Sequence, residues 1–597
     1  MQESMQGMKR SKRVAEVTQA DVDTELCLMG WCHQQRDLGK IVFMTLRDRS
    51  GELQLVVDEE SPEELLAKAQ KVRSEYVLAV RGKLRMRKDP NPGMETGAWE
   101  LHVSELRILS PSKTPPFYIE DEDQARESLR LEYRYLDLRR PVMQKNLMLR
   151  SKATLFTRNW FAERGFIDVE TPTFIKSTPE GARDYLVPSR VFPGKFFALP
   201  QSPQILKQLL MVAGFDRYMQ IARCYRDEDL RADRQPEFTQ LDLELSFASE
   251  EEIFDLLEHY MHDLFQEILG VELDLPFQRL SWDEAMCRFG SDKPDMRMGM
   301  EIQNINEQVK DLDFQVFRSA LDAGGMVGCL VVPGGASFKR RRLDELTDFA
   351  RSRGAKGLVW MAYEDKLRGS ATKFLGQDFM DKLAQDLDAN KGDLFLFIAD
   401  EKYKALDILG RLRLEVGQEL DLIDKKAWRP LWVVHFPMFE YDEENQRLIA
   451  AHHPFTQPLA EDYADESKDP LDWRANAYDL VLNGYELGSG SLRIFDQEMQ
   501  NKIFSLIGMS EEEAHERFGF LLKAFDYGVP PHAGIALGLD RLVMLLCGCD
   551  NIREVIAFPK VQNSTDLMMS CPDYVDPQQL EELGIAIKPG AQNSESE

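Results

Sequence analysis

The sequence predicts a multidomain α+β protein that consists of a small β-barrel, a split α+β core and an α+β module inserted into that core. Its length of 597 residues exceeds what one compact core normally holds. Short β-rich segments dominate residues 1–110, whereas helix and strand patterns are mixed beyond them. Residues 287–429 differ from both flanks, because paired glycines bracket an apolar run and helices then alternate with apolar strands.

The first part of the chain predicts a five-stranded OB barrel. The expected elements are strands over 24–35, 40–49 and 51–58, a helix over 61–72 and strands over 76–87 and 99–110. Ser61 is the expected N-cap of the helix, and Pro62 lies in its first turn. Three strands, a helix and two strands form the element order of an OB fold.

The remaining residues divide by composition. We expect a Pro/Ser/Thr-rich linker over 111–145, two core halves over 146–286 and 430–590, the insert over 287–429 and a polar tail over 591–597. In the linker, residues 131–140 are rich in Arg and Leu and predict a helix. Strands of the insert are expected at 326–333, 357–363 and 393–398.

The net charge of −28 disfavours binding of a polyanion by the chain as a whole. Residues 1–110 are the exception, since 17 basic residues nearly balance 18 acidic ones there. Arg81, Lys83, Arg85 and Arg87 alternate along one predicted strand and share a face. Such a face could meet a polyanion locally; the alternative is a solvated strand face.

Other classes of protein are disfavoured by simple patterns. An apolar run long enough for a transmembrane helix is absent, and no apolar core follows the basic start, so we expect a cytoplasmic protein without membrane contact. The eight cysteines form no CxxC pair. Cys547 and Cys549 have no histidine at zinc spacing, so buried free thiols are expected.

The stretch with the densest charge is Ala222–Glu244, in which two predicted strands, 218–222 and 238–247, flank a loop rich in Arg and Asp. Arg226 and Glu228 lie two residues apart, so an extended chain places both on one face. Such an arginine can pair with a phosphate in fork geometry, and the glutamate can hold a purine amine. A charged surface hairpin is the alternative.

Two further stretches suit nucleotide chemistry. Gly534, Ala536 and Gly538 alternate on a predicted strand and would leave a bare face for adenine, with tight strand–helix packing as the alternative. Asp479 and Glu486 can jointly hold Mg²⁺, which proteins bind through one or two carboxylates and phosphate oxygens. Arg493 is expected beyond a Gly/Ser turn. The alternative to a functional role for Arg493 is a surface ion pair.

In this order the stretches resemble the motifs of class II aminoacyl-tRNA synthetases. Arg150–Pro172 resembles motif 1, the dimer element, while Arg223–Asp242 resembles motif 2 and Gly534–Arg541 resembles motif 3. The strings STPEGARDY (177–185), ALPQSPQ (198–204), RADRQPEFTQLD (231–242) and AHHPFT (451–456) are similar to bacterial-type aspartyl-tRNA synthetase. The resemblance covers nearly the whole chain, with the insert as that family's GAD-type domain.

The resemblance implies ATP-dependent activation of L-aspartate, transfer of aspartate to the 3′ end of tRNA-Asp, a need for Mg²⁺ and a homodimer. It implies an ammonium site at Glu180, Gln204 and Asp242 and a side-chain carboxylate site at Lys207, His452 and Arg493. Arg226 would bridge the reacting groups and, with Arg541, serve catalysis. ATP would contact Arg226, Asp227, Glu228, Gln235, Glu486, Gly538, Leu539, Asp540 and Arg541, the metal would contact Asp479 and Glu486, and the anticodon would contact Arg36, Phe43, Gln54 and Glu100.

A few residues bear on the alternatives. Ser489 stands where the family usually has glycine, and Phe495 where a histidine is common, yet we expect activity because the charged groups remain. Leu38 after Asp37 favours an enzyme specific for tRNA-Asp over one that also charges tRNA-Asn. A non-catalytic tRNA-binding paralogue would lack some of Arg226, Glu228, Glu486 and Arg541, all of which are present. An asparagine synthetase with the same core would lack the barrel, and a lysine pocket would need acids at Lys207 and Arg493.

Overall fold

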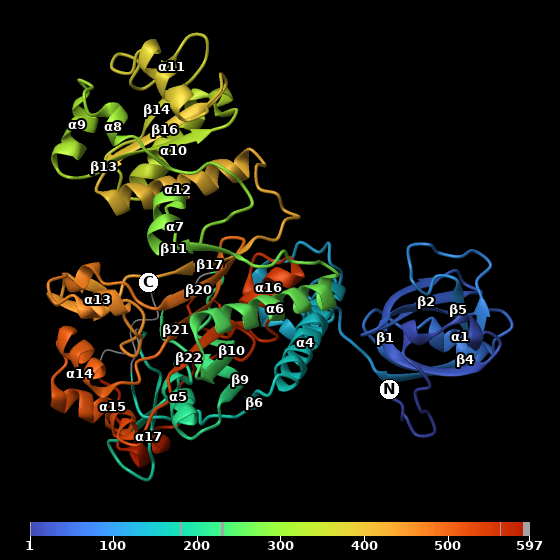
Figure 1. The fold of residues 1–597 in the computed structure, drawn as a ribbon. Coiled ribbons are helices and arrows are strands. Elements are labelled where there is room, and N and C mark those ends of the chain that lie inside the picture. The colour runs from blue at the N-terminus through green and yellow to red at the C-terminus, as the bar shows by residue number, and fades with distance from the viewer. Residues whose placement is uncertain (1, 179–181, 229–231, 562, 589–597) are drawn as a thin grey trace. The chain divides into compact units, whose positions relative to one another are not determined.

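A computed structural model describes residues 2–178, 182–228, 232–561 and 563–588 of the chain (Figure 1). It divides into two compact units, one of Met1–Ser151 with Asn551–Tyr574 and one of Lys152–Asp550 with Val575–Glu597. Within the described ranges, no helix has the length and apolar character needed to cross a membrane.

The first unit contains the predicted closed barrel. Its strands are β1 (Glu25–Asp37), β2 (Val42–Asp48), β3 (Gly51–Val57), β4 (Val77–Met86) and β5 (Trp99–Ser110), joined in the order β1-β2-β3-β5-β4. Alternate residues such as Leu55, Leu84 and Leu101 fill the barrel. Helix α1 (Glu63–Ala69) has Pro62 as its N-cap, so the assignment of Ser61 was wrong. The Ser61 hydroxyl instead accepts a hydrogen bond from the Asp58 amide, at 3.3 Å.

The linker forms two short helices, α2 (Glu127–Glu132) and α3 (Arg134–Asp137), rather than the single predicted helix. Tyr133 interrupts them, with φ −104° and ψ 43°. The buried Arg134 side chain donates to the carbonyl groups of Arg553, Ile556 and Ala557 at 2.7–2.9 Å. It therefore fastens the linker to the segment that contains the turn Ile552–Glu554. The next helix, α4 (Pro141–Ala162), starts nine residues before the expected Arg150, at a proline suited to a first helical turn.

The second unit is built on an eight-stranded sheet in the order β11-β17-β20-β21-β22-β10-β9-β6. The strands are β6 (Ile167–Asp168), β9 (Arg217–Tyr225), β10 (Glu237–Ser246), β11 (Gln278–Ser281), β17 (Pro430–Val434), β20 (Ala477–Leu482), β21 (Tyr485–Leu492) and β22 (His532–Gly538). Only the edge pairs β6–β9 and β11–β17 are parallel among the described strands of this sheet. The expected antiparallel core is confirmed.

The two faces of this sheet differ because polar and apolar residues alternate along its strands. Helix α6 (Glu250–Leu269) lies along one face (Figure 1). Its Phe254 packs against Trp432, with 4.4 Å between ring centres. The other face carries a row that runs Asp479, Ser489, Ala536, Asp242, Gln220 across five adjacent strands. The neighbouring row is Ala477, Ser491, Gly534, Glu244, Tyr218. We call this second side the polar face.

The insert has its own five-stranded sheet, in the order β12-β13-β16-β14-β15. These strands are β12 (Gln303–Asn304), β13 (Met326–Val332), β14 (Val359–Ala362), β15 (Arg368–Gly369) and β16 (Leu394–Asp400). Its helices are α7 (Trp282–Phe289), α8 (Asn306–Val309), α9 (Gln315–Asp322), α10 (Arg340–Ser352), α11 (Gln377–Asp386) and α12 (Lys402–Glu419). Two hydrophobic clusters form from alternate residues of the strands, so both faces of this sheet are covered.

The remaining elements of the second unit surround the large sheet. They are the hairpins β7 (Leu186–Pro188) with β8 (Phe196–Ala198) and β18 (Phe439–Asp442) with β19 (Arg447–Ala450), and the helices α5 (Gln204–Val212), α13 (Ala460–Ala464), α14 (Gln497–Leu506), α15 (Glu511–Phe525), α16 (Leu539–Cys547) and α17 (Pro577–Leu583). No disulfide joins the described cysteines; Cys287 and Cys571 are exposed, and Cys547 and Cys549 half-buried, rather than buried as expected.

Candidate functional site

The centre of the polar face is a buried cluster of four charges, Lys207, Asp242, Glu244 and Arg493, which we call the charged cluster. Lys207 comes from α5, the two acids from β10, and Arg493 follows β21; each side chain is at most 2% exposed. Lys207 pairs with Asp242 and lies 3.1 Å from Glu244. The Arg493 guanidinium donates to both Glu244 oxygens, at 2.9 and 3.1 Å.

Glycine at position 534 makes room for this cluster. A Cβ atom there would lie 1.8 Å from a Glu244 carboxylate oxygen, so any side chain would displace the acid. The space above Gly534 is therefore filled by the protein, and the expectation of a bare surface for adenine fails at that position. Ala536 and Gly538 remain partly exposed further along β22, where a flat ring can still approach.

Mutual compensation determines the ionisation of the cluster. Burial alone would raise the pKa of Glu244, but Arg493 and Lys207 outweigh it and lower the pKa to about 2. For Asp242, burial dominates and raises the pKa even though Lys207 opposes it. Burial acts to lower the pKa of Arg493, and Glu244 reverses this, so the pKa is raised. The cluster thus buries two basic and two acidic side chains in contact with one another on the polar face.

The neighbouring residues His452 and His453 make different contacts. His453 Nε2 lies 2.8 Å from Arg493 Nη1, so His453 rather than His452 contacts the charged cluster directly. His452, the predicted residue, packs its ring edge-on against Phe436 with ring centres 4.9 Å apart. Burial lowers the pKa of both, and Arg493 lowers that of His453 further, so both rings are neutral near pH 7. The sequence analysis missed His453, although its position beside His452 was a usable signal.

The two predicted catalytic arginines, Arg226 and Arg541, each have a buried Nε atom without a hydrogen-bond acceptor in the described part of the chain. Arg226 follows the end of β9, and its guanidinium lies 5.1 Å from the centre of the Phe238 ring. Arg541, in α16, pairs with Asp233 at 3.1 Å and donates to the Glu486 carbonyl. Buried donors normally have acceptors, so these atoms suit an anionic ligand.

The other predicted nucleotide residues lie near the same ends of β9, β10 and β22. Asp227 pairs with Arg183 at 3.5 Å, and Glu228 with Arg234 at 3.1 Å. Because β9 ends at Tyr225, Arg226 and Glu228 do not share a strand face, contrary to expectation. Gln235 is buried and donates to the Arg234 carbonyl at 3.4 Å.

Two residues at the start of α16 have structural contacts. Asp540 accepts from the Thr239 amide at 2.7 Å, and Leu539 is buried. Of the predicted ammonium ligands, Gln204 has a buried Nε2 atom with no partner in the described ranges, and Glu180 lies outside those ranges.

Asp479 and Glu486 form the predicted metal pair, on the paired strands β20 and β21. Asp479 is buried, and its Oδ1 atom has no hydrogen-bond partner among the described residues. Burial and the Glu486 charge raise the pKa of Asp479 well above its usual value, against a hydrogen bond from Ser489. Two crowded carboxylates with an unpaired oxygen fit a hard divalent cation such as Mg²⁺. Ser489 lies within β21, so the predicted Gly/Ser turn before Arg493 was wrong.

Asp292 and Lys293 were missed by the sequence analysis. Lys293 Nζ bonds Asp292 at 2.8 Å, and both charges act on Asp479. Burial would lower the pKa of Lys293, but Asp292, Glu486 and Asp479 raise it. Nearby, Asp295 contacts Gly484 in the β20–β21 turn, with 3.3 Å between its Cβ and an ideal Cβ on the glycine. A lysine near the start of the insert gives no periodic signal that links it to Asp479 and Glu486.

In the barrel, the predicted anticodon residues share the outward face. One row across the strands runs Arg36, Phe43, Val56, His102, Lys83, and the next contains Gln54, Glu100 and Arg85. Gln54 donates to Glu100 at 2.7 Å, and Phe43 is half-buried on β2. The basic residues of β4 are paired with acids, since Arg81 lies 3.8 Å from Glu105 and Lys83 lies 2.8 Å from Asp23.

Comparison with known proteins adds the family. A sequence model described as "tRNA synthetases class II (D, K and N)" matches residues 126–562. The chain belongs to this family. A second sequence model, for an OB-fold nucleic acid binding domain, matches residues 26–109 of the synthetase and agrees with the closed barrel.

Curated relatives of the synthetase include an aspartate–tRNA(Asp/Asn) ligase from Thermoanaerobacter sp. (strain X514), 52% identical over 98% of this chain and 100% of the relative. An aspartate–tRNA ligase from Bacillus licheniformis is 52% identical over 97% of this chain and 99% of its own. Among solved structures, an asparaginyl-tRNA synthetase from Pyrococcus horikoshii, complexed with asparaginyl-adenylate, has a TM-score of 0.57 at 20% identity, covering 92% of this chain and 98% of that one. That likeness shows the shared fold.

Proposed function

We propose that this synthetase is an aspartate–tRNA ligase, which activates L-aspartate with ATP and transfers it to the 3′ end of tRNA-Asp. The observation that carries the proposal is the pair of buried cations, Lys207 and Arg493, on the polar face beside the arginines of the nucleotide region. Relatives that bear this name and are 52% identical over nearly the full chain support it.

The charged cluster explains selection of an acidic side chain. Its two cations already have two internal acids, so a bound aspartate carboxylate would join an existing set of hydrogen-bonded charges. Asparagine would place an amide NH₂ against a guanidinium or ammonium that can only donate. The mismatch would leave buried donors unpaired, at a cost of about 2–5 kcal/mol. Lysine would bring a third cation to Lys207 and Arg493.

The chemistry needs positioning rather than a protein nucleophile. In the first step the aspartate α-carboxylate oxygen attacks the α-phosphorus of ATP, and the bond to pyrophosphate breaks. In the second step a terminal ribose hydroxyl of tRNA attacks the carbonyl carbon of the mixed anhydride, and AMP leaves. The free Nε donors of Arg226 and Arg541 support the roles of neutralising phosphate charge and aligning the groups.

Mg²⁺ would be held by Asp479 and Glu486, whose oxygen donors suit this hard cation. When bound, it would neutralise charge on the phosphates of ATP. Glu228, Gln235 and the partly exposed surface at Ala536 and Gly538 would hold the nucleotide. We keep Glu180, Gln204 and Asp242 as the proposed site for the ammonium group and His452 as part of the carboxylate site.

The range of tRNA substrates is the second question. Leu38, exposed in the β1–β2 turn after Asp37, supports specificity for tRNA-Asp, which we propose. A ligase for both tRNA-Asp and tRNA-Asn is the alternative, favoured by relatives named aspartate–tRNA(Asp/Asn) ligase. Aspartylation of purified tRNA-Asn at a rate close to that of tRNA-Asp would decide for the alternative.

A homodimer in the cytoplasm, assembled through motif 1 and its surroundings, is also proposed. The β7–β8 hairpin and the segment before it expose large apolar side chains, namely Phe174, Leu186, Val191, Phe192 and Phe196. Such a patch is unusual on a monomer surface and supports a subunit interface. Analytical ultracentrifugation should find twice the 68.8 kDa chain mass, and Phe192→Glu with Phe196→Glu should yield monomers.

The function itself is tested by ATP–pyrophosphate exchange with aspartate, asparagine and lysine in parallel. Exchange that depends on aspartate, with the other two amino acids at least about a hundredfold less efficient in kcat/KM, is the expected result. Turnover with asparagine or lysine instead, or with none of the three, would refute the proposal. The domain boundaries at 110, 145, 286, 429 and 590 remain proposals, which limited proteolysis can test.

A further inference from the structure

A continuous hydrogen-bonded chain crosses the outward face of the barrel. Gln54 donates to Glu100 at 2.7 Å, and the other Glu100 oxygen accepts from Arg85 Nε at 2.8 Å. Arg85 Nη2 reaches Asp58 at 3.3 Å, and the remaining Asp58 oxygen lies 2.9 Å from His102 Nε2. We call this set the barrel relay. It ties two residues expected to contact the anticodon to a histidine that has no assigned role.

The position of His102 follows from strand register. His102 on β5 is the partner of Val56 on β3, and Val56 is the partner of Phe43 on β2. Neighbouring strands lie about 4.8 Å apart, so His102 and Phe43 are separated by about 10 Å on one face. A base stacked on Phe43 would therefore lie within a nucleotide's reach of the whole relay.

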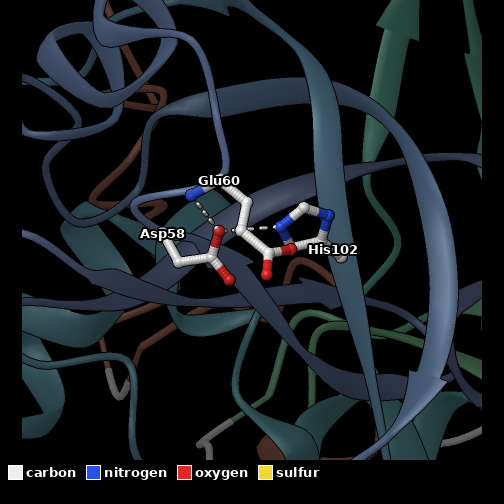
Figure 2. A group of neighbouring side chains, drawn as sticks. All are labelled: Asp58, Glu60 and His102. Carbon is white, nitrogen blue, oxygen red and sulfur yellow. Dashed lines mark hydrogen bonds and ion pairs between the residues drawn. The ribbon is translucent and has the colours of Figure 1, made fainter.

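The chemistry of the Asp58–His102 contact defines its direction. A carboxylate can only accept, so Nε2 of His102 carries the proton that is donated to Asp58. Figure 2 shows the Asp58 carboxylate between the His102 ring and the backbone nitrogen of Glu60, which donates to it at 3.1 Å. Burial would raise the pKa of Asp58, but the bonds from His102, Glu60 and Arg85 lower it, so the carboxylate is ionised.

The contacts from His102 and Glu60 orient the Asp58 carboxylate so that its other oxygen binds Arg85. Without His102, the Asp58 carboxylate loses one of its three donors and can rotate away from Arg85. Arg85 is 36% exposed in its side chain and its other anchor is Glu100. A freed Arg85 would draw the Glu100 carboxylate with it and break the alignment of Glu100 with Gln54.

Although Asp58, Glu60 and His102 lie close enough together to suggest a metal site, the relay explains them better. Arg85 occupies one Asp58 oxygen, while His102 and the Glu60 amide occupy the other. Glu60 is exposed, and its carboxylate is not part of the relay. A cation would have to displace these hydrogen bonds.

We propose that His102 is a positioning residue for tRNA specificity: through Asp58 and Arg85 it fixes the Glu100 carboxylate and the Gln54 amide toward one base of the anticodon. This rests on the proposed aspartate–tRNA ligase function. We expect His102 to affect discrimination between bases, because hydrogen bonds to base edges weaken when the protein groups are misaligned. Activation of aspartate, on another unit of the chain, does not depend on it.

The test compares His102→Leu, which removes the donor, with His102→Gln, whose amide can still donate to Asp58. Aminoacylation is measured with a tRNA-Asp transcript and with transcripts altered at each anticodon position. We expect His102→Leu to lower kcat/KM for the unaltered tRNA about tenfold and to reduce discrimination at one anticodon position. His102→Gln should stay within about threefold of the native enzyme, since the relay is retained.

The control is Ser104→Ala on the same strand, since Ser104 bonds the Arg81 carbonyl at 3.2 Å and lies outside the relay. It should leave discrimination unchanged. Native discrimination in His102→Leu, or equal losses in the Leu and Gln variants, would overturn the proposal. ATP–pyrophosphate exchange with aspartate should be equal in all variants; its absence from the native enzyme would instead refute the proposed function.

Discussion

The charged cluster of the polar face and the barrel relay are built from the same groups in different surroundings. In each, a glutamate accepts hydrogen bonds from an arginine and has a second polar partner: Glu244 bonds Arg493 and forms an ion pair with Lys207, and Glu100 bonds Arg85 and Gln54. The side chains of the cluster are at most 2% exposed, whereas the charged side chains of the relay range from 9% exposed for Glu100 to 36% for Arg85.

This difference in burial separates what the two sets do. Water replaces lost partners in an exposed set, so its ion pairs add little to stability and are free to serve RNA binding. Inside the core, each charge depends on its partner, because an unpaired buried ion costs several kcal/mol. We therefore expect changes in the cluster to affect folding and changes in the relay to affect recognition.

The largest expected effect tests this contrast directly, with Glu244→Gln set against Glu100→Gln. Loss of the Glu244 charge leaves Lys207 and Arg493 with one buried acid between them, so the free energy of unfolding should fall by about 3–5 kcal/mol. Glu100→Gln should cost less, because Arg85 keeps Asp58 as a partner and its side chain is 36% exposed to water. Denaturant unfolding, followed separately for each unit by its own tryptophans, measures both, and equal losses would contradict the comparison.

Arg226 sharpens the comparison from within the core, because its buried Nε has no acceptor among the described residues. Arg226→Lys keeps the charge but removes the fork that suits a phosphate. We expect ATP–pyrophosphate exchange to fall about 10²–10³-fold, which corresponds to about 2.7–4 kcal/mol of transition-state stabilisation. The unfolding midpoint should stay unchanged.

The matched control for that change is Arg223→Lys. Arg223 lies in β9, three residues before Arg226, is exposed and pairs with Glu237 at 2.8 Å. It should retain nearly full exchange activity. Comparable losses in the two variants would mean that general disturbance of β9, rather than a missing phosphate contact, explains the result.

The sequence predicts local features of the molecule but not contacts between distant residues. Alternation of apolar and polar residues, as in Leu241 to Leu245, is a local pattern, and it predicted the barrel strands and the core strands to within a few residues. The contact of Glu244 with Arg493 joins residues 249 positions apart and depends on a missing side chain at Gly534. No periodicity encodes that pairing, which explains why Glu244 was missed.

Errors at element ends have physical causes too. Strand β9 ends at Tyr225; the Arg226 amide still bonds the Pro236 carbonyl at 2.8 Å, but Pro236 has no N–H with which to continue the ladder. Similarly, Gly488 and Gly490 lie in strand β21 rather than in the predicted turn. Glycine is needed there because the cross-strand neighbours leave no room for side chains: a Cβ on Gly490 would lie 2.3 Å from the Gly534 carbonyl. Glycine there signals close packing of strands, and a sequence alone does not separate this from a turn.

At Asp479 we expect a smaller effect on stability, of opposite sign. Burial and the Glu486 charge there outweigh the groups that favour the ionised carboxylate, Ser489 and Lys293. The folded-state pKa of Asp479 lies above the ordinary 3.8, so the native state keeps a proton that the unfolded state has lost. Stability of the metal-free protein should therefore fall as pH rises above 3.8 toward the folded-state pKa. Asp479→Asn should remove this slope and raise the unfolding midpoint at pH 7 in EDTA, while abolishing Mg²⁺-dependent exchange.

Asp462 is the control carboxylate for that experiment. It is equally buried but bonded to Lys468 and to the Arg474 amide, at 2.6 Å for the latter. Asp462→Asn should destabilise the protein at pH 7, so the two substitutions should shift the midpoint in opposite directions. A fall in stability for Asp479→Asn would mean that its carboxylate is compensated in the folded protein.

The smallest effect belongs to Lys83, which tests whether the basic face of β4 meets RNA. Its pairing with Asp23 is exposed on both sides, 60% and 76%, so a phosphate can replace the aspartate with little loss. Lys83→Gln should weaken tRNA binding less than about tenfold, and about equally for all sequences, and should reduce the salt slope by about one. Lys68→Gln on α1 is the control, since Lys68 pairs with Glu3 away from β4. If both variants keep the native salt slope, β4 presents a solvated face, and base contacts at the relay, rather than phosphate contacts beside it, would carry the barrel's affinity.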